Sequence, residues 1–218
     1  EKDKILTNFE EKYDDRYNFL IKYQNEKYAN QFRDLVEFAK TSDEKIGNGN
    51  KFSTAVLNNY FKLMSYKDEY EVSRLYSSDE FINKIKEKFS GNFKINFYLA
   101  PPILYSKDKV TGNPLKIKFG QWLIIIFKIL NKLKFLRGTL FDPFGYFPER
   151  KNERRLVQEY KNTVLEIGKK LNINNYNIAV DLASFPDQIR GFGHVKKKNI
   201  KIAEECRNNL MNVFNESK

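Results

Sequence analysis

Apolar and aromatic residues recur every three or four positions along most of the 218-residue chain. Side chains at that spacing share one face of an α-helix, so each such run predicts a helix with one face to bury. The runs cover about residues 4–38, 53–75, 79–89, 121–137, 149–171, 173–183 and 195–214. Ser53 and Ser78 stand where two of these helices would take an N-cap. The chain is therefore predicted to be mainly α, a multi-helix fold, with the glycine-containing stretch 41–50 as a loop.

One segment, about residues 92–119, breaks the helical pattern. Apolar residues alternate with polar ones in residues 93–98 and again in 115–119, which is typical of half-buried strands. The sequence Thr-Gly-Asn-Pro at 111–114 between them predicts a turn. We expect one β-hairpin protruding from a single mainly helical domain that spans residues 1–218. The sequence begins at Glu1 rather than at a methionine, so the chain is expected to be an excised fragment of a longer protein.

Residues 121–137 combine a run of apolar side chains, from Trp122 to Phe127, with lysines further along. The run is too short for a membrane span, which takes about 20 apolar residues. A buried helix with a basic end is the simpler interpretation. A helix lying in a membrane interface is the alternative.

The sequence lacks the residues that several kinds of metal and cofactor site require. The chain has one histidine, His194, and one cysteine, Cys206, so it cannot form a thiolate zinc site, an iron–sulfur cluster or an internal disulfide by itself. It has no glycine-rich nucleotide loop and no Gly-Asp-Gly thiamine diphosphate signature. We therefore expect no catalytic residue, no metal and no cofactor bound by this segment. The single cysteine suits a reducing cytoplasm.

The net charge of +11 is compatible with several partners. A basic surface attracts nucleic acid, anionic lipid, an acidic protein or a phosphorylated cofactor. The lysines are dispersed, and no RNA-binding motif is present, so we expect no nucleic acid. A stand-alone basic binding module for nucleic acid or an acidic partner nevertheless remains the alternative function.

Five segments are distinctive. They are KLMSYKDEYEVSRLY (62–76), FYLAPP (97–102), LRGTLFDPFGY (136–146), ERRLVQEY (153–160) and IRGFGHVK (189–196). In this order and spacing they resemble the C-terminal domain of the fused, single-chain indolepyruvate ferredoxin oxidoreductase family, over about residues 17–195. Lysine and asparagine often stand where that family usually has arginine and alanine.

This resemblance implies a parent enzyme that oxidatively decarboxylates aryl 2-oxoacids, such as indolepyruvate, to acyl-coenzyme A. Its cofactors would be thiamine diphosphate, magnesium and iron–sulfur clusters, all bound by other parts of the parent chain. Ferredoxin would accept the electrons and coenzyme A the acyl group. The partners of this segment would be the catalytic domains of its own parent chain, in a cytoplasmic homo-oligomer with no membrane span. The segment would cover the thiamine site, help to bind coenzyme A, or hold the dimer together.

Two sets of residues are candidates for contacts. Arginine beside glycine suits a phosphate or carboxylate ligand, because the backbone can approach closely and the guanidinium binds in a bidentate way. The candidates for binding substrate or coenzyme A are Arg137, Asp142, Arg190, His194 and Lys196. Helical spacing around residue 70 predicts Lys67–Glu71 and Glu71–Arg74 charge pairs. The interface candidates there are Tyr66, Lys67, Asp68, Glu69 and Arg74.

For each set a structural role is the alternative. His194 could cap a helix or bond a backbone carbonyl. Arg190 could pair with an acidic residue. The Asp-Pro and glycine residues of the 138–146 loop favour turns by themselves, so this loop could be purely structural. The charges near residue 68 could be a solvated helix face.

Overall fold

The computed structural model describes residues 8–100 and 115–217, and within these ranges it contains nine α-helices and one two-stranded antiparallel sheet. The prediction of a mainly α fold with one β-hairpin is confirmed. The chain divides into two compact units, residues 1–66 with 143–218 and residues 67–142. The expectation of a single domain stays a prediction.

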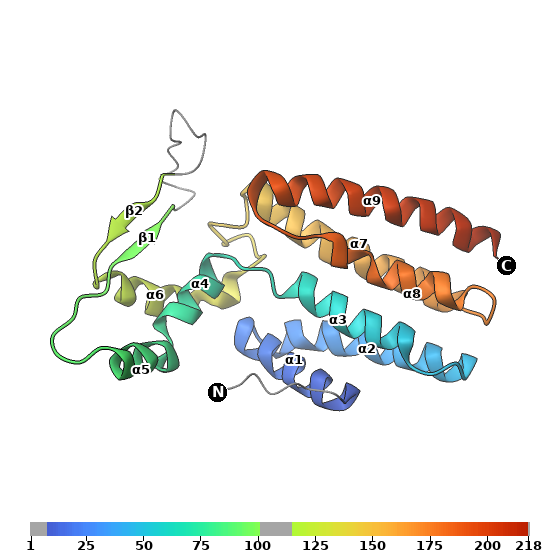
Figure 1. Cartoon of the computed structure of the whole chain (residues 1–218), viewed down its shortest axis with the longest axis horizontal. Helices are drawn as coiled ribbons and strands as arrows, with labels where there is room; N and C mark the ends of the chain where they lie inside the picture. The colour runs from blue at the N-terminus through green and yellow to red at the C-terminus, as the bar shows by residue number, and fades with distance from the viewer. Residues whose placement is uncertain (1–7, 101–114, 218) are drawn as a thin grey trace. The chain divides into compact units, whose positions relative to one another are not determined.

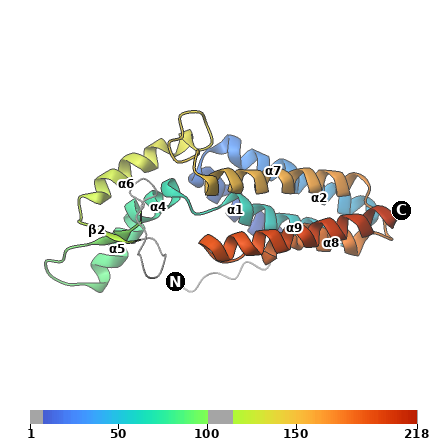
Figure 2. The ribbon, with the colours of Figure 1, turned by 90° about the horizontal axis from the view of Figure 1, so that it is seen from above.

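The first unit contains six α-helices and a short 3₁₀ helix. Their bounds are α1 Phe9–Tyr23, α2 Glu26–Ile46, α3 Lys51–Met64, α7 Pro148–Lys169, α8 Tyr176–Ser184, the 3₁₀ helix Phe185–Gln188 and α9 Gly193–Glu216. Figures 1 and 2 show α2, α3, α7, α8 and α9 running lengthwise beside one another. Helix α3 contacts α1, α2, α7 and α8, so it lies at the centre of this bundle.

Aromatic stacking fills the core around α3. Tyr60 of α3 stacks on Tyr160 of α7 with ring centroids 5.8 Å apart, and on Phe32 of α2 at 6.3 Å. The Phe185 ring packs against the other side of this group, with its centroid 5.8 Å from that of Tyr160. All four side chains are at most 2% exposed. Such contacts supply large buried apolar area and restrict the rings geometrically.

The helix boundaries differ from the sequence prediction in two places near residue 50. Helix α2 continues to Ile46, so the predicted loop 41–50 is wrong for its first six residues. Helix α3 begins at Lys51 rather than at Ser53. The reason is a buried contact between distant parts of the chain: the Ser53 backbone N–H donates to Asp43 Oδ2 at 2.7 Å, and the Tyr176 hydroxyl donates to Asp43 Oδ1 at 2.7 Å.

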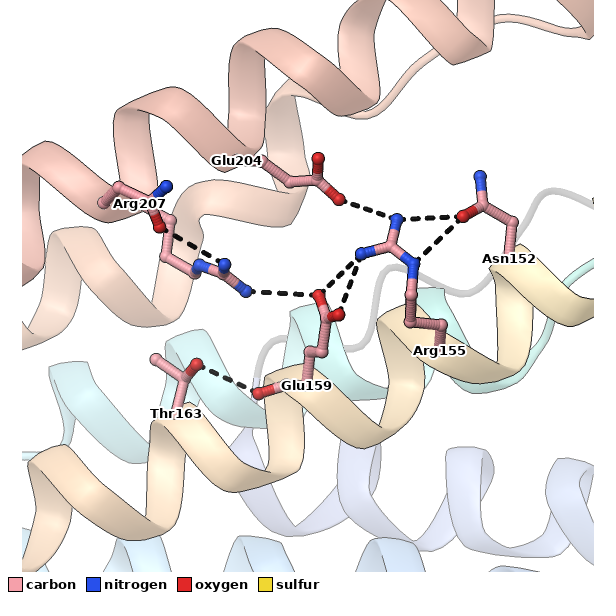
Figure 3. A network of polar contacts seen from close by, with 7 residues as sticks. Asn152, Arg155, Glu159, Thr163, Glu204 and Arg207 are labelled. Carbon is pink, nitrogen blue, oxygen red and sulfur yellow. Dashed lines mark hydrogen bonds and ion pairs between the residues drawn. The ribbon is translucent and has the colours of Figure 1, made fainter.

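Helices α7 and α9 are joined by an exposed polar network (Figure 3). Arg155 of α7 donates to Glu159 on its own helix at 2.8 Å and to Glu204 of α9 at 2.7 Å. Arg207 of α9 donates back to Glu159 at 3.3 Å. Only three side chains of α9 are buried, Ile200, Ala203 and Phe214, so these ion pairs supplement a thin apolar contact.

The second unit contains three α-helices, the two strands and a 3₁₀ helix. Their bounds are α4 Glu69–Ser77, α5 Asp79–Lys88, β1 Phe97–Leu99, β2 Ile117–Phe119, α6 Leu123–Lys132 and the 3₁₀ helix Leu133–Leu136. The strands pair with Phe97 opposite Phe119, inside the predicted segment 92–119. The predicted turn at 111–114 lies outside the described residues. Ser78 caps α5, because its Oγ accepts from the Phe81 N–H at 3.2 Å.

The core of this second unit is small. Phe97, Leu123 and Phe127 are its buried apolar residues, with Tyr76 packed against them. Helix α6 packs on α4 through Phe127, whose ring stacks on Tyr76 at 5.8 Å. The prediction that residues 121–137 form a buried helix is wrong for one side of α6, since Ile125, Ile126 and Ile129 are 40–64% exposed. No described helix is both long and apolar enough to cross a membrane.

Candidate functional site

Two clusters of charged side chains, one in each unit, contain six of the ten residues that the sequence singled out. The first is the buried 68–142 cluster, consisting of Asp68, Tyr70, Arg137 and Asp142, all at most 4% exposed. It joins two of the distinctive segments, 62–76 and 136–146. The second is the 190–196 cluster near the start of α9, which consists of Arg190, His194 and Lys196 together with Lys62, Glu153 and Asp187.

Asp68 is the first anchor of the buried 68–142 cluster. It precedes α4 as the N-cap, and its Oδ1 accepts the Glu71 backbone N–H at 2.8 Å. The same carboxylate binds Arg137 through two hydrogen bonds, Nε to Oδ2 at 2.6 Å and Nη2 to Oδ1 at 2.8 Å. A side chain that caps a helix and neutralises a buried arginine fixes both segments at once.

Asp142 is the second anchor of the buried 68–142 cluster. Its Oδ2 accepts the backbone N–H of Gly138, at 2.8 Å, where the chain turns with φ of +76°. Its Oδ1 accepts the hydroxyl of Tyr70 at 3.2 Å. The Arg137 guanidinium carbon lies 5.5 Å from the centre of the Tyr70 ring, so the two anchors meet across a cation–π contact.

Electrostatics in this cluster favour a neutral tyrosine. Burial raises the pKa of Tyr70, and the Asp142 carboxylate raises it further. The neutral hydroxyl is therefore the donor to Asp142 over the physiological pH range. Nearby, burial lowers the pKa of the Lys134 ammonium, and so do Arg74 and Arg137.

The buried geometry limits what Arg137 and Asp142 can do as ligand-binding residues. The Nε–Nη2 edge of Arg137, which would recognise a phosphate or carboxylate, is occupied by Asp68. A ligand would have to displace Asp68 to reach that edge. Asp142 is similarly engaged by Gly138 and Tyr70. The arrangement suits a rigid structural link between two segments.

The interface candidates of the 66–74 segment fall in different environments. Tyr66 is 7% exposed and its carbonyl accepts the Tyr23 hydroxyl at 2.7 Å. Asp68 is buried, as described, whereas Lys67 is exposed and Glu69 half-buried. The predicted Glu71–Arg74 pair is confirmed, with Nη2 2.7 Å from Glu71 Oε1. The predicted Lys67–Glu71 pair is wrong as a helical pair, because α4 begins only at Glu69.

The 190–196 cluster brings together three of the predicted binding residues. Arg190 is exposed and its Nε donates to the Asp187 carbonyl at 3.0 Å. Lys196 binds Glu153 of α7 at 2.6 Å. His194 is exposed in the first turn of α9, and its imidazole makes no hydrogen bond to any residue that the structure describes.

Lys62 of α3 is a member of the 190–196 cluster that sequence reasoning missed. Its ammonium donates to the Pro186 carbonyl at 2.7 Å and lies 3.8 Å from Asp187 Oδ1. Burial lowers the pKa of Lys62, Asp187 raises it in part, and Arg190 and Lys196 lower it again. No sequence spacing signals this group, because residues 62, 153, 187 and 196 meet only in the folded bundle.

The two clusters differ in what they offer chemically. The buried 68–142 cluster is enclosed and its charges are paired, so it offers no accessible reactive group. The 190–196 cluster places an exposed arginine and an exposed histidine near the N-terminus of a long helix, where the helix dipole favours anions. Among the described residues, no group of three or more histidine, cysteine, aspartate or glutamate side chains could hold a metal ion.

Comparison with known proteins yields one match. Neither curated proteins nor solved structures match the chain. One family profile, described as a family of unknown function (DUF6537), matches residues 9–209. That range contains all the distinctive segments and both charged clusters. The chain belongs to the DUF6537 family.

Proposed function

We propose that this chain is an accessory, interface-forming domain of an indolepyruvate-type 2-oxoacid:ferredoxin oxidoreductase. The parent enzyme would decarboxylate an aryl 2-oxoacid and pass the acyl group to coenzyme A and the electrons to ferredoxin. Thiamine diphosphate, magnesium and the iron–sulfur clusters would be bound by other parts of the parent. This domain would take part in a cytoplasmic, homo-oligomeric enzyme without performing the chemistry.

One structural observation carries the accessory role. Two of the segments on which the resemblance rests, 62–76 and 136–146, meet in the buried Asp68–Arg137 ion pair and the Tyr70–Asp142 hydrogen bond. Their unusual residues thus have a structural use inside this domain. A domain whose distinctive residues hold its own fold is expected to support an active site located elsewhere.

The cofactor content of the native protein tests this proposal. The protein encoded by the whole gene that contains this chain is purified without oxygen, and its thiamine diphosphate, iron and acid-labile sulfide are measured. We expect stoichiometric thiamine diphosphate and at least one iron–sulfur cluster per polypeptide. A gene product that includes no thiamine-binding region, or a protein that contains neither cofactor, would refute the proposal.

The role of the domain itself is tested by thermal unfolding of residues 1–218. A ligand that binds only the native state raises the unfolding temperature. We expect no shift with coenzyme A, thiamine diphosphate with magnesium, or indolepyruvate, because the domain acts once it is docked on its parent. A shift with coenzyme A alone, lost in Arg190→Gln and His194→Gln, would instead make this the acyl-acceptor domain.

A further inference from the structure

One side of helix α6 is an exposed apolar surface, which we call the α6 stripe. It consists of Trp122, Ile125, Ile126 and Ile129, which are 57%, 64%, 40% and 51% exposed. These positions are spaced three, four and seven residues apart, so they form one continuous face of a helix. Contiguous exposed apolar surface of this kind marks an interaction site.

The side of α6 next to the stripe is apolar as well and is already in use. Leu123 and Phe127 are 7% and 4% exposed, and Phe127 meets the Phe97 ring edge-on at 5.2 Å. The apolar surface of α6 is therefore wider than its own unit covers, and Lys128, Asn131 and Lys132 occupy the remaining, polar side of the helix.

The charges that flank the α6 stripe in the sequence are all positive. From Leu115 to Phe141 the sequence contains five lysines and one arginine, and no aspartate or glutamate. Arg137 is neutralised by Asp68. Lys128 and Lys132, on α6 itself, are exposed and lie within 4.0 Å of no carboxylate of the described residues. A surface that covers the stripe must therefore supply carboxylates at its border.

We infer that the α6 stripe is the surface through which this domain docks on the catalytic part of its parent enzyme, against an apolar protein surface bordered by carboxylates. The identity of this partner rests on the proposed function. That the partner's surface is apolar and bordered by carboxylates follows from the exposure and charge of α6. A second copy of the same face is disfavoured, because it would bring Lys128 and Lys132 of both copies together without any compensating carboxylate.

Site-specific photo-crosslinking tests this docking surface in the protein expressed from its whole gene. A benzophenone amino acid replaces Ile126, or Ile125 if the first variant is poorly folded. The control position is Ile173, which lies between α7 and α8 and is 63% exposed. We expect efficient crosslinking from residue 126 to a peptide outside residues 1–218 that lies beside aspartate or glutamate, and little from residue 173.

Three outcomes would overturn the inference. They are crosslinks from residue 126 to α6 of a second copy, crosslinks to lipid, and crosslinks no more efficient than those from residue 173. Lipid as the target would make the stripe a membrane-contact helix instead.

Charge reversal then tests the acidic border. Lys128→Glu with Lys132→Glu is expected to lower the crosslinking yield by on the order of tenfold, because like charges would then face each other. Lys86→Glu with Lys88→Glu on α5 makes the same change of charge at exposed positions and is expected to leave the yield unaltered. Equal yields from the two double variants would refute a carboxylate border.

Cofactor analysis of the same preparation separates the two proposals. A crosslink to an acid-bordered protein surface, in a preparation without thiamine diphosphate, would refute the proposed function and leave the docking surface standing. Thiamine diphosphate present with no crosslink from residue 126 would refute the docking surface alone.

Discussion

Arg137 donates two hydrogen bonds to Asp68, from Nε to Oδ2 at 2.6 Å and from Nη2 to Oδ1 at 2.8 Å, and both side chains are almost completely buried. The two residues are 69 positions apart in the chain and stand near the two ends of the second unit, residues 67–142. The pair therefore ties the start of that unit to its end. Since its apolar core is small, the pair should matter strongly to its stability.

Asp68→Asn should lower the free energy of unfolding by about 3–5 kcal/mol, because it leaves the Arg137 charge buried without a counter-charge. Asparagine caps a helix as well as aspartate does, so the substitution isolates the ion pair from the cap. Urea denaturation at pH 7 measures the loss. Glu80→Gln breaks the exposed Glu80–Lys84 pair of α5 and should change nothing measurable. Equal effects of the two substitutions would contradict this account of the pair.

Two stacked tyrosines should respond differently to loss of the hydroxyl group. Tyr160 donates to the Ala183 carbonyl at 2.7 Å, so Tyr160→Phe should cost about 1 kcal/mol. The buried Tyr60 hydroxyl has no hydrogen-bond partner among the described residues, so Tyr60→Phe should leave stability unchanged or raise it. Thermal unfolding of the two variants compares them directly. A larger loss for Tyr60→Phe than for Tyr160→Phe would show that Tyr60 has a partner.

Gly168 lies where α7 passes close to α2. A Cβ atom there would lie 2.5 Å from Phe38 Cε1 and 3.3 Å from Ser42 Oγ. Gly168→Ala should therefore lower stability by about 1–2 kcal/mol, although alanine favours a helix by about 1 kcal/mol over glycine. In a Phe38→Leu background the same substitution should lower stability less, because the Phe38 ring that the new methyl group would meet is absent. Stabilisation of the wild-type background by Gly168→Ala would mean that the two helices separate easily.

Stability should fall as the pH rises above about 10, where tyrosine ionises in the unfolded chain. Burial raises the pKa of Tyr13 to about 12 and raises that of Tyr60 and Tyr160 as well. Above pH 10 the folded state then holds more protons than the unfolded state, so the free energy of unfolding decreases with pH. The contribution of these tyrosines to stability is complete below pH 10 and is lost as the pH approaches their pKa values in the folded state.

Urea titrations between pH 8 and 11.5, with tyrosinate absorbance followed in parallel, measure this effect. Absorbance should show part of the tyrosine set ionising only as the protein unfolds. Ionisation of all thirteen tyrosines near pH 10 with no loss of structure would contradict the burial of these rings.

Periodicity predicted most of the fold, because helix type depends on local spacing. Alternation of apolar and polar residues predicts the hairpin, although β1 and β2 are shorter than the alternating segments. The boundary errors have distant causes. Asp43 and Tyr176 fix the start of α3 through contacts across the bundle, which no local window contains.

The candidate sites were less predictable for the same reason. Arg137 and Asp142 were recognisable as unusual residues, but their partners, Asp68 and Tyr70, lie some 70 positions away. Periodicity also cannot tell which apolar face of a helix is covered. Residues 121–137 are apolar on two sides of α6, and only the structure shows that Phe127 is buried and Ile125 exposed.

We propose that this domain belongs to a 2-oxoacid:ferredoxin oxidoreductase, and an activity assay of the protein expressed from the whole gene tests this proposal. The measurement is the anaerobic reduction of ferredoxin or benzyl viologen with indolepyruvate, with and without coenzyme A. We expect reduction that depends on both compounds and is impaired by Lys128→Glu with Lys132→Glu but not by Lys86→Glu with Lys88→Glu. Absence of 2-oxoacid-dependent reduction, in a protein shown to be folded, would contradict it.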